Sequence, residues 1–392
     1  MIRKQIRKIL ILFLLALSLL PVHAENAYQL EVDLVSQYAY VIDLTNNEVL
    51  LDIQSKEKMY PASMTKIMTA IVAIENASSL NETIYMDENV FDGLVEANAT
   101  VAGYAVGDEA TINDLLYGVA LPSGADACNA LALHTSGSID NFVKLMNEKA
   151  IELGMKQTHF QNPTGLHDAN HYTTAYDIAT LLTYCIKNDT FKKVFSTRRY
   201  ITAPVASHPN GIDLISTVEN ALDISDVPLP GLGGAKTGFT FEAGHCIAYW
   251  ANNGEFDVVG VTGLADTSMY EMTHVEDMSR TLLELQNWHH KTLSSEGELL
   301  HTITVHHRYE DETIELYVPA TVAMDLRDDY EIQTVFNMPD EITSTNEEQT
   351  LDGLYSILVD GIAVYEKGLH VTIPREPNFF GRFLNWFDDL IH

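Results

Sequence analysis

Three short motifs occur in a fixed order along the 392 residues of this chain. They read Ser63-Met-Thr-Lys66, Ser123-Gly-Ala125 and Lys236-Thr-Gly238. A serine and a lysine three positions apart lie on one face of a helix, and a hydroxyl beside a base is the arrangement that nucleophilic catalysis requires. Together the motifs supply a nucleophile, a base, a second hydroxyl and a cation. This set predicts acyl transfer through a serine ester.

The hydrophobic pattern around the motifs predicts a mixture of helices and strands. Apolar residues from Met64 to Val72 recur with the helical period, so we expect a helix to begin near Ser63. Two β-prone runs, 38–44 and 48–51, flank Thr45-Asn-Asn47 and predict a hairpin. Further helices are predicted at 112–120, 125–134, 139–153, 174–187 and 269–288, and strands at 245–250 and 256–263.

A change of composition near Ser294-Ser-Glu-Gly297 marks the start of a second region. Short β-prone runs follow, some of them separated by turn signals such as Asp360-Gly361. The runs cover 302–306, 313–318, 330–336, 355–359 and 370–373. We therefore expect a catalytic domain over 25–292 and a small all-β domain over 298–373.

The two ends of the chain carry segments of their own. Residues 1–24 combine a basic start, an apolar run and Val22-His-Ala24, which is typical of a cleaved export signal. An uncleaved membrane anchor is the alternative, but the apolar run is short for a span. Residues 378–392 place apolar side chains on one helical face and are too short to cross a bilayer. We expect an amphipathic helix that associates with a membrane surface, and docking on the β-rich domain is the alternative.

The charge, cysteine and histidine content of the chain restricts which partners, disulfides and metal sites can be expected. The net charge of −32 argues against binding to nucleic acid and against electrostatic docking on anionic lipid. The three cysteines are odd in number and lie in apolar contexts, so we expect buried free thiols rather than a disulfide framework. His167 and His171 have the spacing of helical metal ligands, but Gly165, Asp168 and Asn170 mark a loop there. We interpret both histidines as structural and expect neither a metal nor a cofactor.

The first motif needs a lysine that can accept a proton. An ammonium cannot do so, but burial and a second nearby cation both lower a lysine pKa, so Lys66 can be neutral and deprotonate Ser63. The chain contains a second match, Ser55-Lys-Glu-Lys58, in a polar stretch with no apolar helical repeat behind it. Context therefore selects Ser63 as the nucleophile.

The third motif is expected on a strand that lines the site. Lys236 and the Thr237 hydroxyl can hold a substrate carboxylate, while Gly238 lets the backbone approach the ligand. The backbone N–H groups of Ser63 and Phe239 would form the oxyanion hole. Ser123, between two predicted helices, can relay the proton to a leaving amine or can simply cap the second helix, and both interpretations stay open.

The motifs and their surroundings resemble those of the D-alanyl-D-alanine carboxypeptidases, the low-molecular-weight penicillin-binding proteins of the serine peptidase type. The matching stretches are 60–70, 115–118, 121–124, 162–166, 171–177, 234–240 and 242–246. The resemblance implies an α/β (α+β) fold, in which a penicillin-recognising, β-lactamase-like domain has an antiparallel sheet flanked by helices. It also implies that Ser63 is the acyl-ester nucleophile, Lys66 the general base, Ser123 the proton relay and Lys236 the carboxylate ligand.

The same resemblance implies a substrate and a location. The reaction would remove the terminal D-alanine from peptidoglycan stem pentapeptides, at the cell wall or the outer face of the cytoplasmic membrane, and β-lactams would acylate the same serine. The family's second motif normally reads Ser-Gly-Asn, whereas this chain has Ala125, and Asn129 is a candidate substitute for the missing amide. A D,D-endopeptidase, a β-lactamase and a weakened wall-binding protein are the alternatives.

Overall fold

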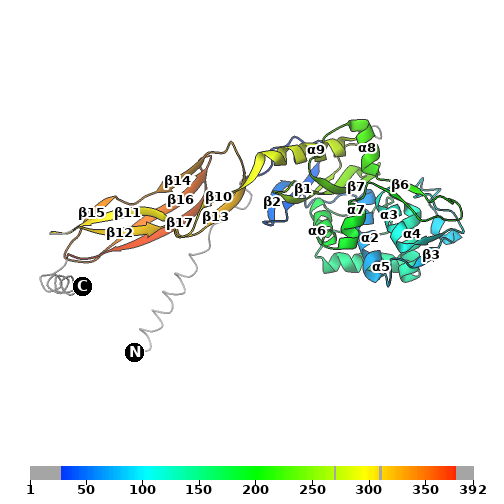
Figure 1. Cartoon of the computed structure of the whole chain (residues 1–392), viewed down its shortest axis with the longest axis horizontal. Coiled ribbons are helices and arrows are strands. Elements are labelled where there is room, and N and C mark those ends of the chain that lie inside the picture. Colours follow the sequence, from blue (N-terminus) through cyan, green and yellow to red (C-terminus); the bar gives the residue numbers. More distant parts are fainter. Residues whose placement is uncertain (1–27, 269–270, 309–310, 377–392) are drawn as a thin grey trace, which may run out of the picture. The chain divides into compact units, whose positions relative to one another are not determined.

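The computed structural model describes residues 28–268, 271–308 and 311–376 (Figure 1). This part of the chain divides into two compact units, a larger one from Tyr28 to Asn287 and a second one that begins at Trp288. All three sequence motifs lie in the larger unit. The predicted export signal at 1–24 and the predicted amphipathic helix at 378–392 lie outside the described residues.

A five-stranded antiparallel sheet forms the centre of the larger unit, with the strand order β2-β1-β9-β8-β7. The strands are β1 (Tyr38–Asp43), β2 (Glu48–Ile53), β7 (Leu232–Thr240), β8 (Gly244–Asn252) and β9 (Asp257–Gly263). Shorter strands, β3 (Thr83–Tyr85) with β4 (Glu109–Thr111) and β5 (Arg199–Ile201) with β6 (Asp213–Ile215), form two separate pairs. The hairpin predicted around residues 45–47 is confirmed.

Helices cover both faces of this sheet, with α9 on one side and α6 on the other (Figure 1). The α-helices are α2 (Thr65–Asn76), α3 (Ile112–Ala120), α4 (Ala125–Ser136), α5 (Ile139–Glu152), α6 (Ala175–Cys185), α7 (Asp189–Phe195), α8 (Thr217–Ser225) and α9 (Thr273–Glu284). The 3-10 turns are η1 (Ala62–Met64), η2 (Glu88–Phe91) and η3 (Leu285–Asn287). The predicted mixed fold with an antiparallel sheet and flanking helices is confirmed.

Most of helix α2 is buried, and its polar side chains determine where the site forms. Its first nine residues are all buried, so every polar group on it needs a partner inside the protein. Thr69 Oγ1 donates to the Pro163 carbonyl at 2.6 Å, and Thr65 Oγ1 lies 2.9 Å from Nε2 of His171. These bonds hold the segment around residues 162–171 against the beginning of α2.

Most predicted helices occur within two residues of their expected ends, but the prediction at 269–288 was too long. Helix α9 ends at Glu284, a 3-10 turn follows, and Trp288 begins strand β10 (Trp288–Ser294). Helices α7 and α8 were not predicted. The seven residues of α7 give too few periods for a clear apolar repeat, and in α8 only Val218 and Ala221 are buried, so its apolar face is narrow.

The second unit consists of β-strands throughout its described residues, as predicted. Besides β10 it contains β11 (Leu299–His306), β12 (Asp311–Tyr317), β13 (Val322–Arg327), β14 (Ile332–Phe336), β15 (Glu341–Thr343), β16 (Gln349–Val359) and β17 (Ile362–Ile373). Its core is built from Ile303, Val305, Val371 and Ile373, which alternate along β11 and β17. Over the described ranges, no helix has the length and apolar character needed to span a bilayer.

Cys128, Cys185 and Cys246 are all free and buried, on α4, α6 and β8. This confirms the expectation of buried thiols. Burial raises the pKa of each thiol, to about 12 for Cys128 and Cys246.

Candidate active site

The first motif forms where the 3-10 turn η1 runs into helix α2. Ser63 lies in η1 and Lys66 in the first turn of α2, and Lys66 Nζ is 3.0 Å from Ser63 Oγ. The Lys66 side chain is buried, and its second partner is the Thr164 carbonyl oxygen. The serine and lysine expected to act together are therefore in direct hydrogen-bond contact.

Both lysines of the motifs lie in an environment that disfavours their charged form. Burial is the main cause that lowers the pKa of Lys66, while Cys128 and Asp126 act in the opposite direction. Burial, followed by the charge of Lys66, lowers the pKa of Lys236 to about 7. The expected effect of burial on the pKa of Lys66 is thus present, whereas the effect of a second cation acts on Lys236 and not on Lys66.

The segment 162–167 delivers the carbonyl that binds Lys66. Asn162 Oδ1 accepts hydrogen bonds from Thr164 N, Thr164 Oγ1 and Gly165 N at 3.1, 2.9 and 2.8 Å, which closes a tight turn. Gly165 has φ +83°, and a Cβ there would lie 2.0 Å from the Ala62 carbonyl oxygen. The turn can therefore rest directly on η1. The sequence patterns predicted no role for Thr164, although 162–166 was among the matching stretches.

Ser123 has an unusual backbone and an unpaired side chain. Its φ is +67°, which is strained for a residue other than glycine. Its Oγ is buried and has no hydrogen-bond partner among the described residues. The N-cap of α4 is Gly124, so the interpretation of Ser123 as a simple helix cap is wrong. A buried hydroxyl without a partner costs about 1–3 kcal/mol, and such groups concentrate at functional sites.

The conformation around Ser123 is fixed by the next carboxylate in the chain. Asp126, fully buried in the first turn of α4, accepts hydrogen bonds from the backbone N–H groups of Ala102, Gly103 and Tyr104 at 2.7, 3.1 and 3.2 Å. The Ala125 N–H donates to the Thr100 carbonyl at 2.8 Å. The segment 100–104 and the second motif are therefore held as one piece.

The structure gives Asn129 a different task from that of a substitute for the missing amide. Its Nδ2 donates to the Val90 carbonyl at 3.0 Å, and the side chain is buried. The amide therefore ties α4 to η2. Ala125 is also buried, and its methyl group supplies no hydrogen-bonding atom.

The third motif lies on β7, as predicted, and packs against the first. A Cβ on Gly238 would lie 3.1 Å from the Ser63 backbone nitrogen and 2.8 Å from Cys246 Sγ, so only glycine allows this approach. Lys236 Nζ donates to the Thr237 carbonyl at 2.9 Å. The Thr237 hydroxyl donates to Thr217 Oγ1 at 2.7 Å, which connects the motif to the start of α8.

Phe239 and the two histidines of the loop lie beside these groups. The Phe239 ring packs on His245, with centroids 4.5 Å apart. His171 is buried against Thr65, and burial lowers its pKa to about 4. His167 meets the Tyr60 ring edge-on at 4.8 Å. Both histidines are thus engaged in packing contacts, in line with their structural interpretation.

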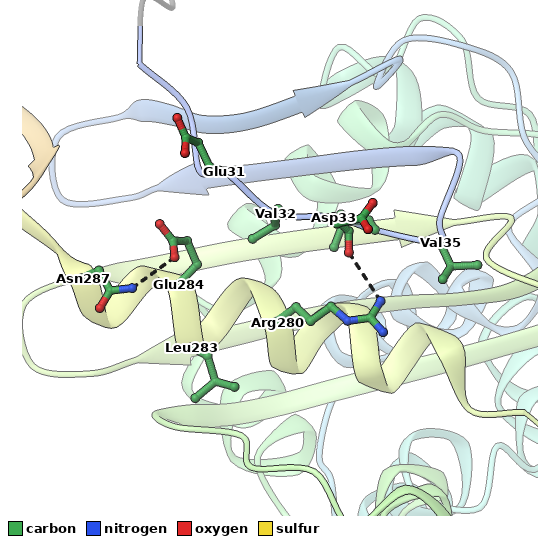
Figure 2. A pocket seen from close by; sticks show the side chains of 9 residues that line it. Glu31, Val32, Asp33, Val35, Arg280, Leu283, Glu284 and Asn287 are labelled. Atoms are coloured by element: carbon green, nitrogen blue, oxygen red, sulfur yellow. Dashed lines mark hydrogen bonds between the residues drawn. The ribbon is translucent and has the colours of Figure 1, made fainter. Parts of the chain in front are cut away.

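A large pocket of about 570 Å³ lies elsewhere on the same unit (Figure 2). Residues 31–35, the end of α9 and Asn287 of η3 line it, and no residue of the three motifs does. Arg280 reaches across it to the Asp33 carbonyl at 3.4 Å, and Asn287 donates to Glu284 at 3.1 Å. The candidate active site is therefore identified by its chemistry and not by the size of a cavity.

Comparison with known proteins agrees with the geometry of the larger unit. Residues 23–267 match the model of the D-alanyl-D-alanine carboxypeptidase peptidase family. The chain belongs to this family. Family members include D-alanyl-D-alanine carboxypeptidase DacF of Bacillus subtilis, which is 35% identical over 244 residues, covering 61% of this chain and 60% of the relative. DacA of Escherichia coli is 25% identical over 368 residues, covering 90% of this chain and 87% of the relative.

Solved structures of the family share the fold. The Streptomyces K15 DD-transpeptidase aligns with a TM-score of 0.58 and 27% identity, over 64% of this chain and 97% of that one. A D-alanyl-D-alanine carboxypeptidase from Mycobacterium tuberculosis gives 0.58 and 27%, over 67% and 94%. The match to DacF of Bacillus subtilis covers 60% of that protein, which is less than two thirds of its length.

Proposed function

We propose that this protein is a serine D-alanyl-D-alanine carboxypeptidase that removes the terminal D-alanine from peptidoglycan stem pentapeptides. The observation that carries the proposal is the 3.0 Å contact between Ser63 Oγ and Lys66 Nζ, in a site where burial lowers the lysine pKa. Membership of the family and the names of the relatives support the same reaction. A neutral lysine beside a serine hydroxyl is the minimum that acyl transfer requires.

In the proposed mechanism, Lys66 acts as the general base for Ser63. The Thr164 carbonyl accepts one N–H of the neutral amine, which leaves the nitrogen lone pair for the serine proton. Ser63 Oγ then attacks the carbonyl carbon of the scissile bond. The backbone N–H groups of Ser63 and Phe239 stabilise the negative charge on the carbonyl oxygen.

Collapse of that intermediate breaks the C–N bond to the terminal D-alanine. Ser123 passes the proton from Lys66 to the leaving nitrogen, a role supported by its buried and unpaired hydroxyl. Lys236 and Thr237 hold the carboxylate of the leaving residue. Water then hydrolyses the ester on Ser63, which regenerates the hydroxyl and releases the shortened peptide. A β-lactam, whose strained amide mimics the scissile bond, acylates the same oxygen.

A second outcome of the same acyl-enzyme is transfer to an amine instead of water. One structural neighbour is named a DD-transpeptidase, which favours keeping this candidate. Endopeptidase action on cross-links is a third outcome with the same residues. Product analysis distinguishes all three. Hydrolysis and transfer both free D-alanine, but hydrolysis leaves a shortened peptide and transfer yields a larger one, while endopeptidase action halves a cross-linked dimer.

We further propose that the protein is exported and acts at the cell wall or the outer face of the cytoplasmic membrane. The basic and apolar start of the chain supports export, and the helical spacing of apolar residues within 378–392 supports membrane association. Deleting residues 377–392 is expected to release the protein from the membrane fraction. An unchanged distribution would contradict the anchor.

The decisive experiment combines substrate and inhibitor. The chain from residue 25 onward is incubated with a pentapeptide ending in D-Ala-D-Ala, and separately with a penicillin, next to Ser63→Ala. We expect loss of one alanine from the peptide and a covalent penicillin adduct on Ser63, both absent in the variant. Fast turnover of the penicillin would favour a β-lactamase instead. No reaction with either compound would favour a wall-binding protein and identify Ala125 as a real defect.

A further inference from the structure

Helix α7, which the apolar pattern of the sequence did not predict, forms one side of a small cavity next to both lysines of the site. The cavity measures about 10 Å³, roughly the minimum that one water molecule needs. Besides Lys66 and Lys236, it is lined by seven apolar side chains from α2, α3 and α7. These seven side chains offer no hydrogen-bonding atom, so a water molecule there could meet only the two lysine amines, which already donate to Ser63, Thr164 and Thr237.

Phe195 is the residue of α7 that lies over the strand of the third motif. A Cβ on Gly234 would lie 2.4 Å from the Phe195 carbonyl oxygen and 2.7 Å from its ring atom Cδ1. Because side chains alternate along a strand, Gly234 and Lys236 share one face of β7. The glycine therefore lets α7 approach this face beside Lys236. The Phe191 ring stacks on Phe195 with centroids 5.3 Å apart, which widens the apolar surface.

Few charged groups face the two lysines from the surrounding elements. The titratable groups near them are Asp126 and Cys128 on α4, Cys246 on β8, His171 in the segment before α6 and His274 on α9. Asp126 is the one carboxylate of this set, and it favours the charged form of Lys66. On α7 itself, Lys192 lies over the Trp250 ring at 4.1 Å. The lowering of both lysine pKa values therefore depends chiefly on the exclusion of water.

We propose that α7 is the wall that keeps water from the lysine pair, and that Phe195 is a positioning residue for the reaction. Phe195 acts through Lys66 and Lys236 and makes no contact with substrate. If its ring were replaced by a small polar group, water would enter beside the lysines and solvate their ammonium forms. This inference rests on the proposed acyl transfer, because its main readout is acylation of Ser63.

The test measures the rate of penicillin acylation against pH for the full chain. Phe195→Ser is the main variant. An apolar substitution could leave the enlarged cavity dry, whereas the serine hydroxyl gives water a polar partner on the wall that is otherwise apolar. We expect the acid limb of the profile to move up by about one pH unit, so that the rate at the foot of this limb falls roughly tenfold while the high-pH plateau is retained. Phe195→Leu, which keeps the cavity filled, should retain the wild-type profile.

A matched control separates this effect from a loss of stability. Phe142→Ala removes another fully buried ring, on α5, that does not line the cavity. It should lower Tm without moving the acid limb. If Phe195→Ser does not fold, Ala120→Ser places a hydroxyl in the same cavity from α3, and a shift in the same direction is expected.

A second readout does not depend on activity. An amine-reactive reagent is expected to label Lys66 and Lys236 at least fivefold faster in Phe195→Ser than in the wild type, with exposed Lys144 as the internal reference. Unchanged labelling together with an unchanged acid limb would contradict the proposal that α7 keeps water from the two lysines. Absence of acylation in the wild type would instead overturn the proposed function, and the labelling alone would then decide the role of α7.

Discussion

The buried position of Lys236 links the activity of single residues to the stability of the fold. Burial lowers its pKa from 10.5 to about 7 in the folded protein. Between these two values the unfolded chain binds a proton that the native chain largely lacks, so the free energy of unfolding rises with pH across this window. The side chain thus costs stability at neutral pH, and its retention requires a functional reason.

Lys236→Met tests this cost. The variant is expected to raise Tm at pH 7 and to weaken the rise of Tm between pH 7 and pH 10, while peptide cleavage is lost with the carboxylate ligand. Calorimetry at the two pH values measures the effect. A variant with a lower Tm at pH 7 than the wild type would contradict it.

Asn129 offers a second test at the scale of one side chain. Because its amide binds the Val90 carbonyl inside the protein, Asn129→Ala is expected to cost about 1–3 kcal/mol of stability. The acylation rate of the folded protein should stay unchanged. Denaturant unfolding and penicillin labelling measure the two quantities separately. A stable variant with slow acylation would instead assign Asn129 the task of the asparagine that the second motif lacks.

At the scale of elements, the turn 162–167 is the part whose placement controls the general base. Gly165→Ala puts a Cβ against the Ala62 carbonyl and is expected to push the Thr164 carbonyl away from Lys66. We expect a displacement of the carbonyl by about 1 Å to lower the acylation rate by about 10- to 100-fold. Gly154→Ala is the matched control, because Gly154 has a similar φ of +76° with no atom within 4 Å of its Cβ. Equal rates in the two variants would show that only backbone strain matters.

Strand β11 of the second unit carries an ionic contact of its own. The two ring nitrogens of His306 face Asp311 at 2.9 Å and Glu341 at 3.4 Å, on β12 and β15. Hydrogen bonds to these carboxylates raise the pKa of His306, since only the protonated ring donates from both nitrogens. The contact therefore stabilises the three strands fully below the unfolded pKa of about 6.5 and is lost as pH rises through the higher folded value.

Hydrogen exchange of β11 and β12 in the full chain measures this contribution. After correction for intrinsic exchange, protection is expected to fall from pH 5.5 to pH 8 in the wild type. In His306→Gln it should be nearly constant over the same range. A parallel decline in both proteins would rule out His306 as the cause.

For the molecule as a whole, the sequence predicted what depends on local patterns and missed what depends on distant contacts. The helix behind Ser63 and the all-β second unit follow from periodicity and composition, while the strand of Lys236 was expected from the role of the third motif. Helix α7 is too short for such a signal, and its position depends on the bare backbone at Gly234. The positive φ of Ser123 occurs beside Asp126. The Asp126 carboxylate binds the segment 102–104, and this segment lies more than twenty residues earlier in the chain.

The three buried cysteines of the larger unit can report when the structure around them opens, because only an exposed thiol is alkylated. Each thiol is inert to alkylation in the closed fold, because burial both blocks access and suppresses the thiolate. Iodoacetamide at pH 8 is therefore expected to leave the native protein unmodified and to label all three thiols in urea. Timed pulses followed by peptide mass spectrometry would then rank α4, α6 and β8 by how often each is exposed. Reaction of any of the three at the rate of a free thiol under native conditions would contradict this expectation. The three native thiols can therefore report local opening of the elements that carry them, and no label has to be engineered into the chain.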